Sequence, residues 1–295
     1  MSKDLQDILV RGTAWNNKLR VFAARTTNVT EEMRVRHDMF PTATAALGRT
    51  AAVGFMMGAM LKGEERLVIQ VKGDGPIGQV VVNANAKGEL RGYVDNPRAH
   101  HATNQYGKLD VAGAVGTSGF IHVTKDLGLK EPYRGSVPII SGELGEDFTY
   151  YFSVSEQTPS CVAVGVLVDS DNSVLQAGGL IIQVLPGLSD QDITKLEEAI
   201  ASMPSVTQML SEGKTPEDMI AQLVGDDFTI HEQMDLKFKC NCSYERLSGT
   251  LISVGAHELQ SMIDDNETIE LVCHYCNEKY YFTPEQIKIL KEQAR

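Results

Sequence analysis

Four of the five cysteines lie in two close pairs near the end of the 295-residue chain. Cys240 and Cys242 form a C-x-C pair, and Cys273 and Cys276 form a C-x-x-C pair after 30 intervening residues. Two close pairs joined by a long loop suit a tetrahedral four-thiolate zinc site, because each pair supplies one edge of the tetrahedron. The C-x-C pair departs from the zinc-ribbon spacing of C-x-x-C twice. We expect these cysteines to bind zinc, with disulfides or a buried thiol cluster as the alternative.

Other candidate metal or catalytic residues match their motifs poorly. His274 lies inside the C-x-x-C pair, where a residue usually points outward, and four cysteines already fill a tetrahedron. His257 and Glu258 begin the zinc-protease motif H-E-x-x-H, but position 261 is serine. Cys161 stands alone in an apolar stretch and is expected to be a small buried residue rather than a nucleophile. The sequence shows no Gly-x-Ser-x-Gly elbow or nucleotide loop, so we do not expect an enzyme.

Composition restricts the partners and the compartment. The 27 basic and 39 acidic residues give a net charge of −12, which disfavours a protein that tracks nucleic-acid phosphates. Residues 1–7 carry acids where a signal peptide would be apolar. No apolar run approaches the roughly 20 residues that span a bilayer. Five cysteines without an export signal suit a reducing compartment, so we expect a cytoplasmic protein with no nucleic-acid or membrane partner.

The first 186 residues predict antiparallel sheet interrupted by helices. Strands at 66–72, 77–83 and 89–94 are separated by turns at Gly73–Pro76 and at Lys87 and Gly88. Such short connections favour antiparallel pairing, because parallel strands need long crossovers. We interpret the Gly73–Pro76 stretch as a turn, since it lacks the phosphate-loop pattern. Further strands are expected within 5–25 and at 120–124, 160–168 and 175–185.

Helices are expected on both sides of Pro41, which marks a break between them. Thr30, followed by Glu31 and Glu32, is expected to cap the first helix. The stretch 43–61 is rich in alanine, glycine and methionine, which predicts a tightly packed core helix; an adaptable apolar surface is the alternative. Another helix is expected at 141–152.

The composition changes after residue 186. Ser189 caps one predicted helix, and Thr215 with Pro216 begins another, so residues 187–231 are expected to form a helical linker. A helix at 258–263, a strand at 280–282 and a last helix capped by Thr283 are expected beyond it. The predicted fold class is α+β, with an N-terminal antiparallel-sheet domain (1–186), the helical linker and a small C-terminal zinc-binding domain (232–295).

The clustered thiols also predict a switch. A closed four-thiolate site is structural, and zinc binding supplies the folding energy of a small domain, on the order of 10–16 kcal/mol. Peroxide or hypochlorous acid converts thiolates to disulfides through a sulfenic acid, and each thiol here has an adjacent partner. Oxidation would consume the ligands and remove the energy that keeps the segment folded.

These features make the chain resemble the heat shock protein 33 family of redox-regulated bacterial chaperonins. The resemblance rests on the C-x-C and C-x-x-C pairs near the end of the chain, and on further stretches in the family order. These stretches are Gln70–Pro76, Ser155–Gln157, Gly178–Leu180 with Gln183–Pro186, and Phe238–Cys240. The resemblance covers nearly the whole chain.

The resemblance implies an ATP-independent holdase that protects unfolding client proteins during oxidative and heat stress. In this family the reduced form, with one Zn²⁺ per chain, is a poor chaperone. Oxidation is implied to form the disulfides Cys240–Cys242 and Cys273–Cys276. Zinc release then unfolds the C-terminal domain and the linker, and the protein forms a homodimer that binds clients.

Other classes of function are also compatible with the residues. A zinc-ribbon module could dock nucleic acid or a protein, although 7 basic and 11 acidic residues from His231 onward disfavour nucleic acid. An enzyme could use zinc only as a structural staple, but no acid–base or nucleophile constellation supports this. A thiol oxidoreductase would need its C-x-x-C at the start of a helix in a thioredoxin-like unit, which the sequence does not predict.

Overall fold

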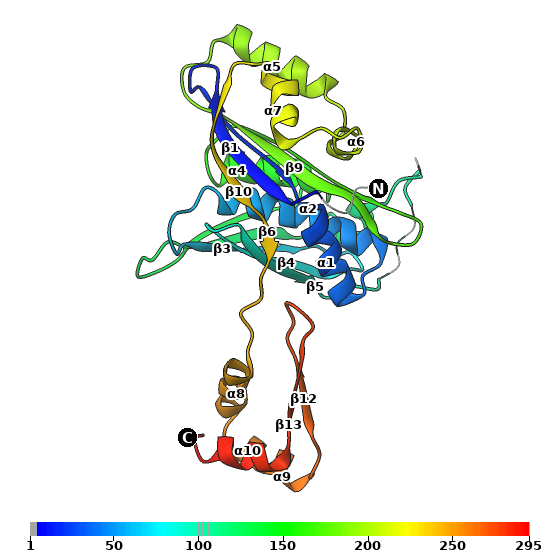
Figure 1. The fold of residues 1–295 in the computed structure, drawn as a ribbon, viewed down its shortest axis with the longest axis vertical. Coiled ribbons are helices and arrows are strands. Elements are labelled where there is room, and N and C mark those ends of the chain that lie inside the picture. Colours follow the sequence, from blue (N-terminus) through cyan, green and yellow to red (C-terminus); the bar gives the residue numbers. More distant parts are fainter. Residues whose placement is uncertain (1–4, 100, 102, 106, 295) are drawn as a thin grey trace. The chain divides into compact units, whose positions relative to one another are not determined.

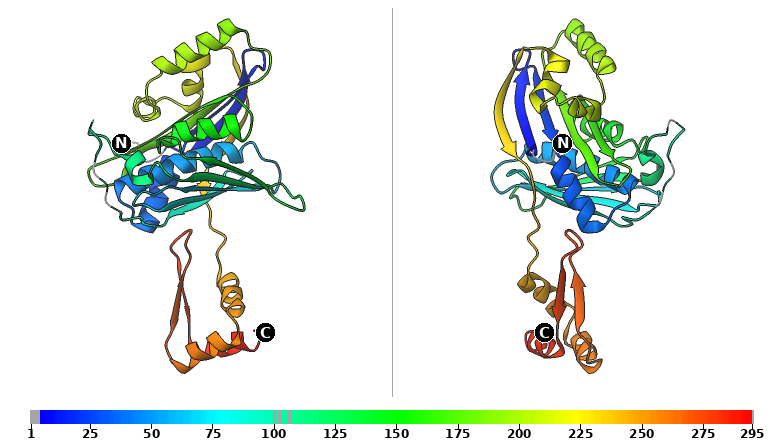
Figure 2. Two further views of the ribbon diagram at one scale, coloured as in Figure 1. Left: turned by 180° about the vertical axis from the view of Figure 1, so that it is seen from behind. Right: turned by 45° about the vertical axis from the view of Figure 1, so that its right-hand side comes forward.

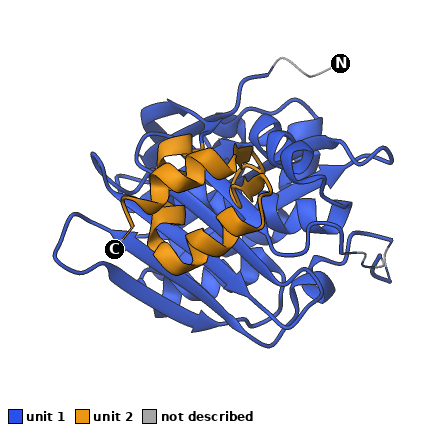
Figure 3. Cartoon of the chain, turned by 90° about the horizontal axis from the view of Figure 1, so that it is seen from below, with its two compact units in different colours: residues 1–239 blue, residues 240–295 orange. Residues whose placement is uncertain are grey.

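The structure, a computed structural model, describes residues 5–99, 101, 103–105 and 107–294. It divides into two compact units, Met1–Lys239 and Cys240–Arg295, which Figure 3 colours separately. The fold is α+β, as predicted. The three-part division at residues 186 and 231 stays a prediction. Residues 1–4, which contributed to the argument against a signal peptide, lie outside the described residues.

Sheet A of the first unit has the strand order β10-β1-β2-β9-β8, and all its neighbours pair antiparallel (Figure 1). The opening strand expected within 5–25 is a hairpin of β1 and β2. Gly178 allows β9 to approach β2 closely, because a Cβ there would lie 2.4 Å from the Ala24 carbonyl oxygen. The strands are β1 (Ile8–Ala14), β2 (Leu19–Arg25), β8 (Ser160–Val168), β9 (Val174–Val184) and β10 (Phe228–Asp235).

Strand β10 corrects the sequence prediction, which extended the helical linker to residue 231. Its residues alternate between half-buried and exposed positions, and they pair with β1. This alternation is a strand signal. The prediction missed it because the well-capped helices just before it are the stronger local pattern.

Sheet B has the order β11-β5-β4-β3-β6-β7, antiparallel except for a parallel pairing of β11 with β5. The predictions at 66–72 and 89–94 are confirmed to the residue, whereas β7 was not predicted. The strands are β3 (Arg66–Lys72), β4 (Gln79–Asn85), β5 (Glu89–Val94), β6 (Phe120–Asp126), β7 (Tyr133–Pro138) and β11 (Lys237–Phe238).

Helix α2 (Pro41–Gly58) lies between the two sheets and forms the centre of the main core (Figures 1 and 2). Apart from Arg49, every residue from Thr42 to Gly58 is buried, so the core-helix prediction is confirmed. Small residues let the strands come close: a Cβ at Gly54 would lie 2.7 Å from the Val82 side chain. Helices α3 (Val111–Val115) and α4 (Leu144–Val154) complete this region.

The predicted cap at Thr30 is wrong. Helix α1 (Thr27–His37) begins three residues earlier, and the Thr30 hydroxyl donates to the Thr26 carbonyl oxygen inside the helix. The first N–H groups of the helix are instead satisfied by Asp7, whose carboxylate accepts from the backbone of Asn28 and Val29. Because this partner lies about twenty residues upstream, local sequence patterns cannot reveal it.

Three helices follow β9 and cover the outer face of sheet A: α5 (Asp190–Ser202), α6 (Val206–Ser211) and α7 (Pro216–Val224) (Figure 1). The predicted caps at Ser189 and Thr215 are both present as capping boxes. The helices and the sheet share a second apolar cluster, separate from the main core. Its buried members are Val10, Ala14, Trp15, Leu19, Val21, Ala23, Leu180, Ile182, Leu196, Val206, Met209, Leu210, Met219, Ile220, Leu223 and Val224.

The second unit is small. It contains α8 (Tyr244–Ser253), α9 (Ala256–Asp264), a hairpin of β12 (Ile269–Val272) and β13 (Lys279–Phe282), and α10 (Pro284–Lys291). Thr283 caps α10 in a capping box, as predicted. Its own apolar cluster has as buried members Leu251, Leu259, Phe282, Ile287 and Leu290. Among the described helices of either unit, none combines the length and apolar character needed to cross a bilayer.

Candidate metal centre

The four paired cysteines meet in the second unit. Cys240 and Cys242 precede α8, and Cys273 and Cys276 lie in the turn between β12 and β13. The Sγ atoms of Cys240 and Cys273 are 3.7 Å apart, those of Cys242 and Cys276 are 3.3 Å apart, and all four lie within 4.8 Å of one another. All are free thiols. Residues 33 and 34 positions apart in sequence thus form one cluster of sulfur atoms.

The hairpin turn holds the second pair. The Cys273 N–H donates to the Glu278 carbonyl oxygen at 2.9 Å, and the Asn277 N–H donates to the Cys273 carbonyl oxygen at 2.8 Å. Asn277 takes a left-handed backbone conformation with φ of 59°, which asparagine tolerates better than most residues. The turn therefore points both sulfurs of the C-x-x-C pair to one side.

Helix α8 and strand β13 both help to fix the first pair. Ser243 comes directly after Cys242, and its hydroxyl oxygen accepts from the Arg246 N–H to cap α8. The Tyr280 hydroxyl, on β13, donates to the Cys242 sulfur at 3.2 Å. Tyr280 was not predicted as a site residue, and no signal in the sequence could have indicated it, because it lies 38 positions from Cys242.

The cluster fits a tetrahedral metal ion. Zn–S bonds of about 2.3 Å place the sulfurs of a regular tetrahedron about 3.8 Å apart, which is close to the 3.7 Å between the Cys240 and Cys273 sulfurs. An all-sulfur donor set is typical of zinc or of iron–sulfur clusters, and unsuited to magnesium or calcium. With four protein ligands a zinc ion would have no open coordination position, so the site would be structural rather than hydrolytic.

Burial favours the protonated thiols of Cys273 and Cys276 unless a cation binds. Burial raises the pKa of the Cys273 and Cys276 thiols above the ordinary value for cysteine. Backbone hydrogen bonds from Tyr275 and Cys276 act to lower the pKa of Cys273, without offsetting burial. Because metal ligands must be thiolates, metal binding here would release protons.

The remaining sequence candidates lie outside the cluster. His274 is exposed, and the His257 side chain is 97% exposed next to Glu258. Cys161 lies on β8 and is half-buried rather than buried as predicted, because β8 is the outermost strand of sheet A. Burial still raises the pKa of its thiol, which disfavours a nucleophile.

The position of the C-x-x-C pair also bears on the thiol oxidoreductase alternative. That chemistry needs the pair at the N-terminus of a helix, which lowers the pKa of the attacking thiol. Here the pair lies in a hairpin turn between short antiparallel strands, and the pKa of both thiols is raised. The geometry suits metal binding and disfavours disulfide exchange.

Comparison with known proteins gives consistent matches over nearly the whole chain. The family model described as Hsp33 protein matches residues 7–283. The 33 kDa chaperonin of Bacillus subtilis is 49% identical over 288 residues, covering 98% of this chain and 99% of its own length. That of Brevibacillus brevis is 51% identical over 288 residues, covering 97% and 99%. The crystal structure of the 33 kDa chaperonin of Thermotoga maritima matches with a TM-score of 0.92 and 35% identity, covering 98% of this chain and 99% of that chain.

Proposed function

The chain belongs to the Hsp33 family, and from this membership we propose that it is a redox-regulated, ATP-independent holdase chaperone. It binds unfolding client proteins during oxidative and heat stress and keeps them from aggregating. Relatives named 33 kDa chaperonin support the chaperone activity. The observation that carries the redox regulation is the cluster of four thiols in its own small unit, directly beyond Lys239.

In the reduced protein, Cys240, Cys242, Cys273 and Cys276 hold one Zn²⁺ per chain. The ion supplies a closed tetrahedral link between the start of the unit and its hairpin. The apolar cluster of this unit is small, with only five buried members among the described residues. A unit of about 56 residues with so small a core depends on its metal for stability.

Oxidation proceeds through the cysteine sulfurs. One thiolate attacks hydrogen peroxide to form a sulfenic acid and hydroxide, which takes up a proton to give water. A neighbouring thiol then attacks the sulfenic acid and displaces a second water to form a disulfide. Each disulfide takes two electrons from two thiols and consumes one peroxide. By family resemblance the pairs are Cys240–Cys242 and Cys273–Cys276. Four sulfurs tied in two disulfides no longer provide thiolate ligands, so the residues release the ion and the unit loses its main source of stability.

Unfolding of the second unit affects sheet A because the chain connects the two directly. Helices α5, α6 and α7 cover an apolar face of β1, β2 and β9, and the chain runs from α7 through β10 to Cys240. When the second unit unfolds under mild heat, the linker helices α5, α6 and α7 detach. Both their apolar faces and the sheet beneath become exposed, which gives a surface that binds unfolded chains. The same surface supports a homodimer in the activated state. We place this activity in the cytoplasm, without enzymatic, nucleic-acid or membrane functions.

The test measures zinc content, free thiols and chaperone activity together. Peroxide with mild heat should release one zinc per chain and switch on suppression of client aggregation. The double variant Cys240→Ser/Cys242→Ser should lose the oxidant response, whereas Cys161→Ser, outside the cluster, should keep it. An unchanged oxidant response in the double variant would show that the switch is assigned to the wrong residues.

A metal-removal experiment tests whether the second unit depends on the metal independently of the two sheets. A chelator alone should increase hydrogen exchange in the second unit, from Cys240 onward, while sheets A and B stay protected. Equal loosening throughout the chain would contradict a separately folding metal unit.

A further inference from the structure

The last residues of the first unit, Leu236–Lys239, form a short segment that we name the latch segment. It leads directly into Cys240 and contains β11. Two backbone hydrogen bonds of 2.9 Å hold it to β5 and to the turn before β5: Lys237 N–H donates to Gly88 O, and Lys239 N–H donates to Leu90 O. A parallel pairing of two residues at a sheet edge is weak by itself, so side chains must contribute most of the attachment.

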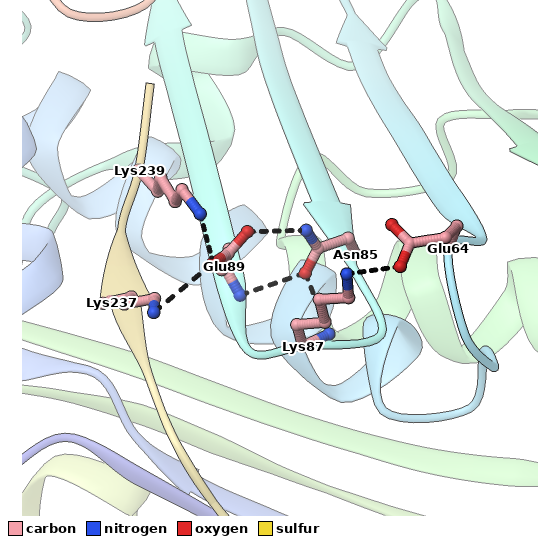
Figure 4. Close-up of polar contacts among 6 residues, drawn as sticks. All are labelled: Glu64, Asn85, Lys87, Glu89, Lys237 and Lys239. Atoms are coloured by element: carbon pink, nitrogen blue, oxygen red, sulfur yellow. Dashed lines mark hydrogen bonds and ion pairs between the residues drawn. The ribbon is translucent and has the colours of Figure 1, made fainter. Parts of the chain in front are cut away.

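Glu89 on β5 is the main side-chain anchor (Figure 4). Its side chain is 12% exposed, and one carboxylate oxygen lies 2.7 Å from the Lys239 Nζ and 3.3 Å from the Lys237 Nζ. Asn85 donates to its other oxygen at 3.0 Å. Burial by itself would raise the pKa of Glu89, but hydrogen bonds from Lys239, Asn85 and Lys237 outweigh it and lower the pKa to about 2. The carboxylate is therefore charged, well oriented and shielded from solvent on one side.

The opposite face of the latch segment is apolar. Successive residues of a strand point to opposite faces, so Phe238 faces away from the two lysines. Phe238 packs against the main core, and the Arg36 guanidinium lies 4.7 Å from its ring centroid. Leu236 is buried in the same core and donates its N–H to the Asp7 carbonyl oxygen at 3.0 Å.

The turn before β5 leaves no space for a side chain at Gly88. A Cβ there would lie 2.3 Å from the Asp235 carbonyl oxygen, and Gly88 has a φ of +71°. This turn is therefore shaped to accept the chain where β10 ends and the latch segment begins.

We propose that the bonds between Glu89 and the latch segment act as a brake: they limit how far unfolding spreads from the second unit, the cysteine unit, to the helices that cover sheet A. This proposal rests on the function proposed above and concerns whether unfolding of the second unit spreads into the first. While the cysteine unit is folded, it holds the chain at Cys240. The latch segment then has little conformational freedom and stays paired with β5. Once that unit unfolds, the segment borders a disordered tail and tends to fray. The bonds of Glu89 then decide whether fraying reaches β10, at the edge of sheet A, and from there α7.

The experiment compares two glutamates in the same corner of sheet B. Glu89→Gln removes both ion pairs of the latch segment, and Glu64→Gln removes the exposed pair of Glu64 with Lys87 shown beside it in Figure 4. Hydrogen exchange is measured on full-length reduced protein, with zinc and after chelation, without oxidant or client. After chelation, Glu89→Gln should lower the protection of β10 and α7 amides about ten- to a hundredfold relative to wild type, the scale of a lost charge-assisted bond. Glu64→Gln should not differ from wild type.

Amides of β3 distinguish a brake from a general contribution to stability. Protection of β3 should be the same in Glu89→Gln and wild type, because β3 lies inside sheet B and is not downstream of the latch segment. Equal loosening of β3 and β10, or no change in β10, would overturn the proposal. If Glu89→Gln folds poorly, Lys239→Met removes the closest ion pair from the other side and must show the same pattern. Because no client or oxidant is present, a failure of the proposed chaperone function would leave this result unaffected.

Discussion

Shortening Leu223 should partly activate the reduced, zinc-bound protein. Leu223 lies on α7, is 3% exposed, and packs in the second apolar cluster between the linker helices and sheet A. Leu→Ala substitutions in buried positions cost about 2–5 kcal/mol. If about 3 kcal/mol of this loss falls on the attachment of α7, the ratio of detached to attached helices rises about 100-fold.

The assay measures exposure and activity without oxidation. Leu223→Ala in reducing buffer should bind a hydrophobic dye and slow the aggregation of a heat-denatured client, while its zinc content and thiol count match wild type. Ile69→Ala is the matched control, because Ile69 is fully buried in the main core and does not lie under the linker helices. A destabilised Leu223→Ala variant that stays inactive while reduced, or equal activation by Ile69→Ala, would contradict this prediction.

Two other predictions concern single side chains. Burial raises the pKa of the Asp7 carboxyl to about 6, although N–H groups of Val29 and Asn28 act to lower it. The folded protein therefore holds a proton there that the unfolded chain releases near pH 4, and the stability contributed by Asp7 is lost as pH rises through about 6. Carbon-detected NMR should give a carboxyl midpoint near pH 6, and a midpoint near pH 4 would contradict this. Tyr280→Phe removes the hydrogen bond to Cys242 and should weaken zinc binding about tenfold; competition with a chromophoric chelator should show this loss, with the exposed Tyr281→Phe unchanged.

Features set by neighbouring residues were predictable from the sequence. The caps at Ser189, Thr215 and Thr283 depend on residues three positions away, and each is present. The spacing of the cysteines likewise indicated a common cluster, because each pair is local and one long loop suffices to join them. Such features need no knowledge of the rest of the fold.

Features set by distant residues were not predictable. The start of α1 depends on Asp7, and the contact of Tyr280 with Cys242 spans 38 positions. The parallel pairing of β11 with β5 joins residues about 150 positions apart, and two residues carry too little pattern to indicate a strand. The pairing of β11 with β5 lies directly before Cys240, so sequence patterns indicated the four-cysteine cluster but not how the chain leading into it is held.

The central claim is that loss of the zinc-bound thiolates activates the chaperone. The most direct measurement is a peroxide titration at mild heat in which zinc release, remaining free thiols and suppression of client aggregation are followed on the same samples. We expect one zinc and four thiols per chain to be lost in step with the gain of activity, with Cys161 remaining reduced. Full activity in samples that still hold their zinc and all four thiols would contradict the account.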